Sequence, residues 1–142
     1  MRKYYSLCYL LIFILFFISC EENNDSDSQL SLTEASEIVI DEIIQGDTIS
    51  VVIYAIPEII QKMDSIIVSN DSDRFYQFDF DTWFFFIDDA PPANWAHDCR
   101  YIFVNPKTSE HYLYEENYFP ICYEDLIIVK SWPSDINPFW EG

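Results

Sequence analysis

The sequence predicts an α+β fold in which an N-terminal helix packs on a curved antiparallel β-sheet. Apolar residues recur at helical spacing between residues 32 and 45, and runs rich in β-branched and aromatic residues follow from residue 49 onward. Turn-forming residues separate these runs, and no repeat period connects them. One helix followed by several short strands favours an antiparallel sheet with the helix laid across one face.

The helix is predicted over residues 32–45 from the signals at its two ends. Ser31 and Glu34 have the spacing of a capping box, in which each side chain accepts a hydrogen bond from the backbone of the other residue. Apolar residues then recur every three or four positions up to Ile44. Gly46 is placed to end the helix in the left-handed conformation, which glycine adopts without steric cost.

Strands are predicted along the rest of the chain, each bounded by polar or turn-forming residues. The run at 83–87 is continuously apolar, which is typical of a central strand that is buried on both faces. Residues 59–63 are predicted as a short helical turn, 70–73 as a loop and 105–109 as the turn of a hairpin. The predicted strands cover residues 49–56, 65–68, 75–80, 83–87, 100–104, 110–114 and 126–129.

The first twenty residues have the order of a bacterial secretion signal. Arg2 and Lys3 precede an apolar run over residues 7–18, and Cys20 and an acidic stretch follow it. The apolar run is shorter than the roughly 20 residues that a membrane-spanning helix requires. A cysteine at the cleavage point resembles a lipoprotein signal, so we expect cleavage before Cys20 and diacylation of its thiol. The alternatives are an uncleaved anchor helix and ordinary secretion.

These features divide the chain into four parts: a signal peptide at 1–19, an acidic disordered tether at 20–30, a folded domain at 31–133 and a loose C-terminal tail at 134–142. The acidic residues behind Cys20 resemble the signal that sends lipoproteins to the surface of some Gram-negative bacteria. We therefore expect an outer-membrane or cell-surface location, with a periplasm-facing position as the alternative. The lipid is the expected contact with the membrane.

The chain is strongly acidic, with a formal net charge of −18. Nucleic acid is excluded as an expected partner, because phosphate binding requires clustered Lys and Arg. The charge favours a basic protein partner or divalent cations, although solubility alone also explains it.

Two cysteines remain once Cys8 leaves with the signal and Cys20 carries lipid. An oxidising compartment favours a disulfide between Cys99 and Cys122. Two buried free thiols are the competing interpretation. A metal site is not expected, because these cysteines lack partner ligands at close spacing.

Three segments of the chain carry a resemblance to a known domain family. Residues 101–110, Tyr-Ile-Phe-Val-Asn-Pro-Lys-Thr-Ser-Glu, resemble the Tyr-x-Val-x-Val-Asp-x-x-Thr-Gly-Glu hairpin of the PepSY-like domain family. Residues 32–39 are similar to its opening helix, and residues 83–89 and 95–100 are similar to a block seen in secreted bacterial proteins with such domains. The chain departs from the pattern at Ser109, where the family has Gly, and at Asn105, where it has Asp.

The resemblance implies a function without catalysis. PepSY-like domains resemble the inhibitory propeptides of secreted proteases, which implies a binding module that inhibits or regulates a secreted protease or binds another envelope protein. The family has no catalytic residues to carry over, and its inhibitory contacts vary, so no inhibitory residue is assigned here. We expect a monomer that uses no cofactor.

The charged residues around the 88–100 segment are the best candidates for local chemistry. Two carboxylates and a histidine could bind a divalent metal or share a proton. The alternative, which we favour, is that the first two aspartates end a strand, His97 packs beside Trp95, and Asp98 pairs with Arg100. As a binding patch, the candidate residues are Asp88, Asp89, Trp95, His97, Asp98, Arg100, Tyr112 and Tyr114.

Aromatic residues offer the second candidate function, a surface lipoprotein that binds glycans. They make up 18% of the chain, and a late group around Tyr112 and Tyr114 could exceed what one sheet face can bury. Enzyme chemistry has less support. The chain has two histidines and no Gly-x-Ser-x-Gly elbow, and two glycines are too few for a phosphate-binding loop.

The lipoprotein signal makes a direct prediction. Replacement Cys20→Ala removes the only thiol placed for acylation, so the variant should carry no fatty acyl group and should leave the membrane fraction. Mass analysis of the N-terminal peptide checks this. The same replacement at Cys8, inside the predicted signal, is the control that should leave acylation unchanged.

Overall fold

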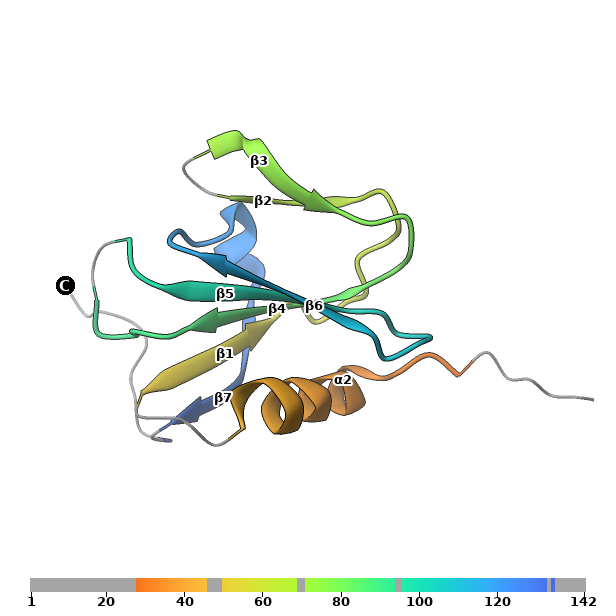
Figure 1. Ribbon diagram of the computed structural model, residues 1–142, viewed down its shortest axis with the longest axis horizontal. Helices are drawn as coiled ribbons and strands as arrows, with labels where there is room; N and C mark the ends of the chain where they lie inside the picture. The colour runs from red at the N-terminus through yellow and green to blue at the C-terminus, as the bar shows by residue number, and fades with distance from the viewer. Residues whose placement is uncertain (1–27, 46–49, 69–70, 94–95, 133, 135–142) are drawn as a thin grey trace, which may run out of the picture.

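The computed structural model describes residues 28–45, 50–68, 71–93, 96–132 and 134. Its main layer is a five-stranded antiparallel sheet in the order β6-β5-β4-β1-β7, and β2 and β3 form a second, two-stranded sheet (Figure 1). The predicted α+β class is confirmed in its coarser form, since antiparallel strands dominate and a short helical segment accompanies them. The predicted signal peptide, with Cys20, lies outside the described residues, as do most of the tether and tail.

The helical segment consists of α2 (Leu32–Ile38) and a π-helical turn η1 (Val39–Ile44), and a 3-10 helix η2 (Ile121–Asp125) precedes the last strand. Within the described ranges, no helix is long and apolar enough to cross a membrane. The strands are β1 Val51–Ala55, β2 Ser65–Val68, β3 Asp71–Gln77, β4 Trp83–Asp88, β5 Cys99–Val104, β6 His111–Glu116 and β7 Ile127–Trp132.

The predicted capping box begins α2. The Ser31 backbone N–H donates to Glu34 Oε2 at 2.8 Å, and the Glu34 backbone N–H donates to Ser31 Oγ at 3.3 Å. The left-handed residue at the other end is Gln45 (φ 50°) and not the predicted Gly46, which lies outside the described residues. Gln45 accepts this conformation because its backbone N–H and its side chain donate to the carbonyls of Ile40 and Glu42.

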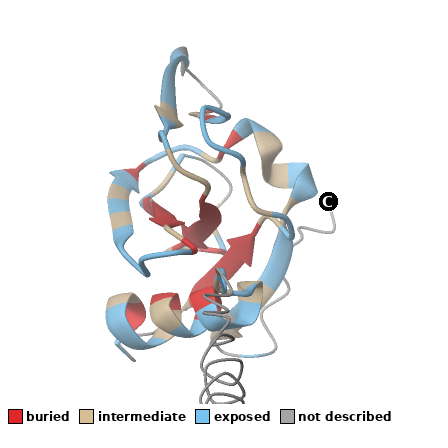
Figure 2. Cartoon of the chain, turned by 90° about the vertical axis from the view of Figure 1, so that its right-hand side faces the viewer, coloured by how far each residue is buried: buried red, intermediate tan, exposed pale blue. Residues whose placement is uncertain are grey.

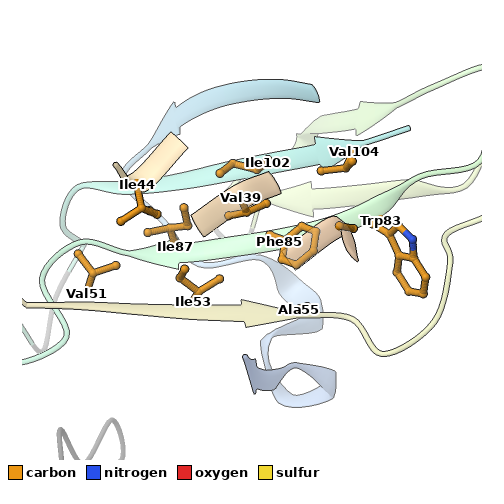
Figure 3. Packing of buried hydrophobic residues seen from close by; sticks show 11 residues of the cluster. Val39, Ile44, Val51, Ile53, Ala55, Trp83, Phe85, Ile87, Ile102 and Val104 are labelled. Atoms are coloured by element: carbon orange, nitrogen blue, oxygen red, sulfur yellow. The ribbon is translucent and has the colours of Figure 1, made fainter. Parts of the chain in front are cut away.

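All six residues of β4 are buried, as its apolar run predicts. Figure 2 shows central strands of the molecule in the colour of buried residues. Trp83, Phe85 and Ile87 join one core cluster with residues of the helical segment such as Val39 and Ile44 (Figure 3). The Trp83 indole N–H also donates to the Leu30 carbonyl at 2.8 Å, which fastens the chain before the helix to the sheet.

Phe84 and Phe86 belong to a second cluster on the opposite face. The β2–β3 hairpin and η2 cover this face, and the rings of Tyr76 and Tyr114 lie 4.4 Å apart between hairpin and sheet. The main sheet is therefore the middle of three layers, and its central strands have almost no contact with solvent.

The 105–109 turn forms as predicted. The Asn105 side-chain oxygen accepts from the backbone N–H groups of Lys107 and Thr108, which is the capping role expected of Asp or Asn here. Ser109 takes the left-handed conformation (φ 63°) at the position where PepSY-like turns have Gly, at a cost of about 1 kcal/mol.

Two local predictions are wrong. Residues 59–63 form no helical turn; Ile60 instead pairs with Thr82 through two backbone hydrogen bonds of 2.9 Å. The predicted loop at 70–73 overlaps β3, which begins at Asp71, because the Val68 to Asp71 pairing closes the hairpin tightly. In both places long-range backbone pairing overrides the local turn signals.

The two-sided core gives a stability prediction. Replacement Phe85→Ala removes a fully buried ring and should lower the free energy of unfolding by about 3–5 kcal/mol. Phe75, which is 53% exposed on β3, is the matched control, and Phe75→Ala should change it by less than about 0.5 kcal/mol. Urea titration followed by circular dichroism measures both, and equal losses would contradict the assignment of the core.

Candidate functional site

Antiparallel pairing of β4 and β5 gathers the predicted charged residues at one end of the sheet. Asp88 lies opposite Cys99, and Ile87 lies opposite Arg100. The connection between the strands begins with Asp89 and returns through His97 and Asp98. Five of the eight predicted patch residues therefore lie together at this end. Trp95, which we also predicted as part of the patch, lies outside the described residues.

Asp88 and His97 form a buried pair. Asp88 Oδ1 lies 2.8 Å from His97 Nε2, and their side chains are 5% and 9% exposed. Asp88 Oδ1 also accepts from the Ala90 backbone N–H at 3.0 Å, and the His97 ring packs edge-on against Phe119 at 5.3 Å. Burial raises the pKa of Asp88, while the hydrogen bonds from His97 and Ala90 oppose that rise. The pair closes the β4–β5 connection onto the sheet.

Arg100 pairs with Asp89 and not, as predicted, with Asp98. Its Nε lies 2.8 Å from Asp89 Oδ2 and its Nη2 lies 2.5 Å from Asp89 Oδ1, which is a bidentate contact. Asp98 instead accepts from the Asn117 side-chain amide at 3.0 Å. The register of the hairpin explains this difference. Ile87 lies directly opposite Arg100, so Asp89, two residues further along the chain, lies diagonally across from Arg100 and within its reach.

A cleft of about 450 Å³ opens beside this cluster. Both side chains of the Asp89–Arg100 pair are about a quarter exposed, so the pair is accessible at the cleft wall. Carboxylates outnumber the single guanidinium among the lining residues, which gives the cleft a negative character. It is lined by Asp89, Asp98, Cys99, Arg100, Glu115, Glu116 and Asn117.

The two predicted patch tyrosines lie elsewhere, on β6. Tyr112 and Tyr114 are half-buried, and their rings contact those of Phe78 at 5.4 Å and Tyr76 at 4.4 Å. They belong to the packing between the sheet and the β2–β3 hairpin. The structure thus separates the predicted patch into a charged part and an aromatic part.

The predicted disulfide is not formed in the structure, where Cys99 and Cys122 are free thiols. Cys99 Sγ donates to the Tyr118 carbonyl at 3.4 Å. Burial raises the pKa of Cys99 to about 12 and that of Cys122 to about 11. Both thiols are therefore protonated at neutral pH, and a thiol in that state is a poor nucleophile.

Sequence reasoning missed Glu116, whose side chain is wholly buried. Its Oε1 accepts from the Tyr76 hydroxyl and lies 2.8 Å from Arg74 Nη2, so it ties the β2–β3 hairpin to the end of β6. Alternation along β6 could have revealed it, because Glu116 shares a face with the half-buried Tyr112 and Tyr114.

The described part of the chain holds no group of three or more His, Cys, Asp or Glu side chains placed to bind a metal ion. A scan against protein-family models found no match, and searches of curated proteins and of solved structures found no similar protein.

The raised pKa of Asp88 predicts how stability depends on pH. The stabilisation linked to this group is fully present below its unfolded pKa of about 3.9 and is lost as pH rises through the higher folded pKa. Replacement Asp88→Asn removes this dependence. The free energy of unfolding of the wild type, measured relative to D88N by urea titration, should decline as pH rises above about 4. Parallel curves for the two chains would contradict the raised pKa.

Proposed function

We propose that this chain is a lipid-anchored binding module of the bacterial cell envelope that acts without catalysis and inhibits or regulates a secreted protease. In this proposal Cys20 carries the lipid, residues 20–30 form the tether, and the folded domain faces the outside of the cell or the periplasm. The domain is PepSY-like, with its helical segment laid across a curved antiparallel sheet.

The observation that carries the proposal is the cleft at the β4–β5 end. Its Asp89–Arg100 pair is preorganised by a bidentate contact. Of its other carboxylates, Asp98 accepts from the Asn117 side-chain amide, and Glu116 is held by Tyr76 and Arg74. Paired, partly exposed charges at the rim of a concave surface suit the recognition of a polar or charged group on a partner. The thiols of Cys99, which is buried, and Cys122, which is half-buried, have raised pKa values that keep them protonated, and this supports a binding role over nucleophilic catalysis.

Glycan binding is the second candidate, and the exposure of two rings favours it. Phe75 is 53% exposed and Tyr118 is 37% exposed. The support is weaker than for protein binding, because the rings of Tyr112 and Tyr114 already pack against other aromatic rings of the protein.

Affinity capture with the full-length acylated chain tests the proposal. Envelope extracts should yield a protein that the wild type retains and that Asp98→Lys releases, because Asp98 is exposed at the cleft. Asp64→Lys, at an exposed turn outside the cleft, is the matched control and should retain the partner. If the partner is a protease, addition of the wild-type chain should lower its rate of peptide hydrolysis.

The opposite outcomes are equally distinct. Retention that is the same for the wild type and both variants would remove the cleft from the proposal. Binding to a glycan array that Tyr114→Ala abolishes, with no protein retained, would replace protein binding with the second candidate.

A further inference from the structure

β6 is an outer strand of the main sheet, and its far edge is open. Within the described ranges it pairs with β5 alone (Figure 1). In an antiparallel edge strand, alternate backbone N–H and C=O groups point away from the sheet and remain able to pair with a further strand. Natural proteins protect such edges with charged side chains, most often lysine, with proline, with a bulge or with an inward-pointing charge. Over its six residues β6 has no lysine, proline or bulge, and its pairing with β5 is regular throughout. Its charged side chains, Glu115 and the buried Glu116, are both carboxylates, which oppose an acidic strand but not a basic one.

The side chains of β6 divide into two rows. His111, Leu113 and Glu115 form an exposed row. Leu113 is the apolar residue of this row, and it is 42% exposed. Tyr112 and Tyr114, on the other face, are half-buried. A strand placed beside β6 would thus find an apolar position in the middle of the exposed row and aromatic rings on the opposite face.

Acidic hollows lie at both ends of this row. The hollow at the start of β6 has a volume of about 420 Å³ and is lined by Glu42, Glu110 and His111, among others. Glu42 Oε2 lies 3.8 Å from His111 Nδ1, so its carboxylate borders the strand. The cleft at the end of β6 is lined by Glu115 with Asp89 and Asp98. Carboxylates therefore flank Leu113 on both sides, and at the cleft they outnumber one guanidinium, that of Arg100.

We propose that the open edge of β6 binds an extended segment of a protein partner, which adds a sixth strand to the sheet. The segment has basic side chains at the two positions that face His111 and Glu115, and an apolar side chain between them, facing Leu113. The two basic positions are four residues apart, or about 13 Å along a strand. This inference rests on the proposed function, since it specifies the chemistry of the protein that the module binds.

The opposite edge, β7, is the competing surface. Ile127 and Ile128 are exposed there, at 43% and 44%. Lys130 lies within the same strand, and a lysine is a common guard of a sheet edge. β7 itself has no carboxylate, so a basic segment gains nothing from that strand. Charge complementarity therefore selects β6.

A defined peptide tests the proposal on the full-length chain in detergent micelles. The probe is acetyl-Thr-Lys-Thr-Val-Thr-Lys-Thr-amide, which places lysines four positions apart with valine between them. Titration into the isotopically labelled chain should produce saturable changes in the backbone amide NMR signals of residues 110–117. Glu115→Lys should weaken the affinity about tenfold or more, because it places like charges opposite each other. Glu124→Lys, an exposed charge reversal in η2, should leave it unchanged.

Two control peptides separate strand addition from simple charge attraction. N-methylation of alternate amides on one edge of the peptide removes its backbone donors, and methylation of the edge that faces β6 should abolish binding. Replacement of both lysines by glutamate should abolish it too. Signal changes confined to residues 127–132, equal affinity of E115K and the wild type, or no saturable change at residues 110–117 would each overturn the proposal. None of these results bears on the envelope capture experiment, which tests the proposed function by itself.

Discussion

The structure depends on a sheet that is apolar on both faces. All six residues of β4 are buried, and its side chains alternate between two separate core clusters. A sheet of this kind is unstable unless something covers each face, since exposed rings on either side would lose the free energy gained by burial. The helical segment covers one face, and the β2–β3 hairpin with η2 covers the other.

The burial of both sheet faces determines where the chain can place polar groups. Carboxylates that enter the core must be paired, because an unpaired buried charge is costly. Asp88 pairs with His97 and the Ala90 backbone, while Glu116 pairs with Arg74 and Tyr76. The contacts of Glu116 also join β3 to the end of β6, and the Asp88–His97 pair joins the end of β4 to the connection that follows it. Asp89, Asp98 and Arg100 gather at the β4–β5 end, where the candidate cleft and the open edge of β6 lie side by side through Glu115.

Features that depend on local chemistry could be predicted from the sequence. The capping box at Ser31 and Glu34, the apolar run of β4 and the Asn105 turn all follow from a few neighbouring residues. The pairing of β1 with β7 could not be predicted. These strands lie more than seventy residues apart, and no local sequence signal specifies which residues of two such distant strands pair.

The candidate site divides in the same way. Its membership at the β4–β5 end was predictable, since a hairpin returns residues 97–100 to the neighbourhood of 88 and 89. The ion pairs within the site were not predictable. Asp98 and Arg100 are close in sequence, yet the pairing of β4 with β5 places Arg100 in contact with Asp89, and Asp98 binds Asn117. Cys99 and Cys122 fall into the same cluster without a bond, because a shared compartment and an even count of thiols do not specify a distance.

Native-state hydrogen exchange of the backbone amides tests the two-sided sheet most directly. If burial on both faces holds the fold together, the amides of β4 should exchange only through global unfolding, with the free energy that denaturant titration gives for the whole chain. The amides of the β2–β3 hairpin, with one outer face in solvent, should open locally at a lower free energy. Exchange of β4 amides at a free energy no higher than that of the hairpin would contradict the account.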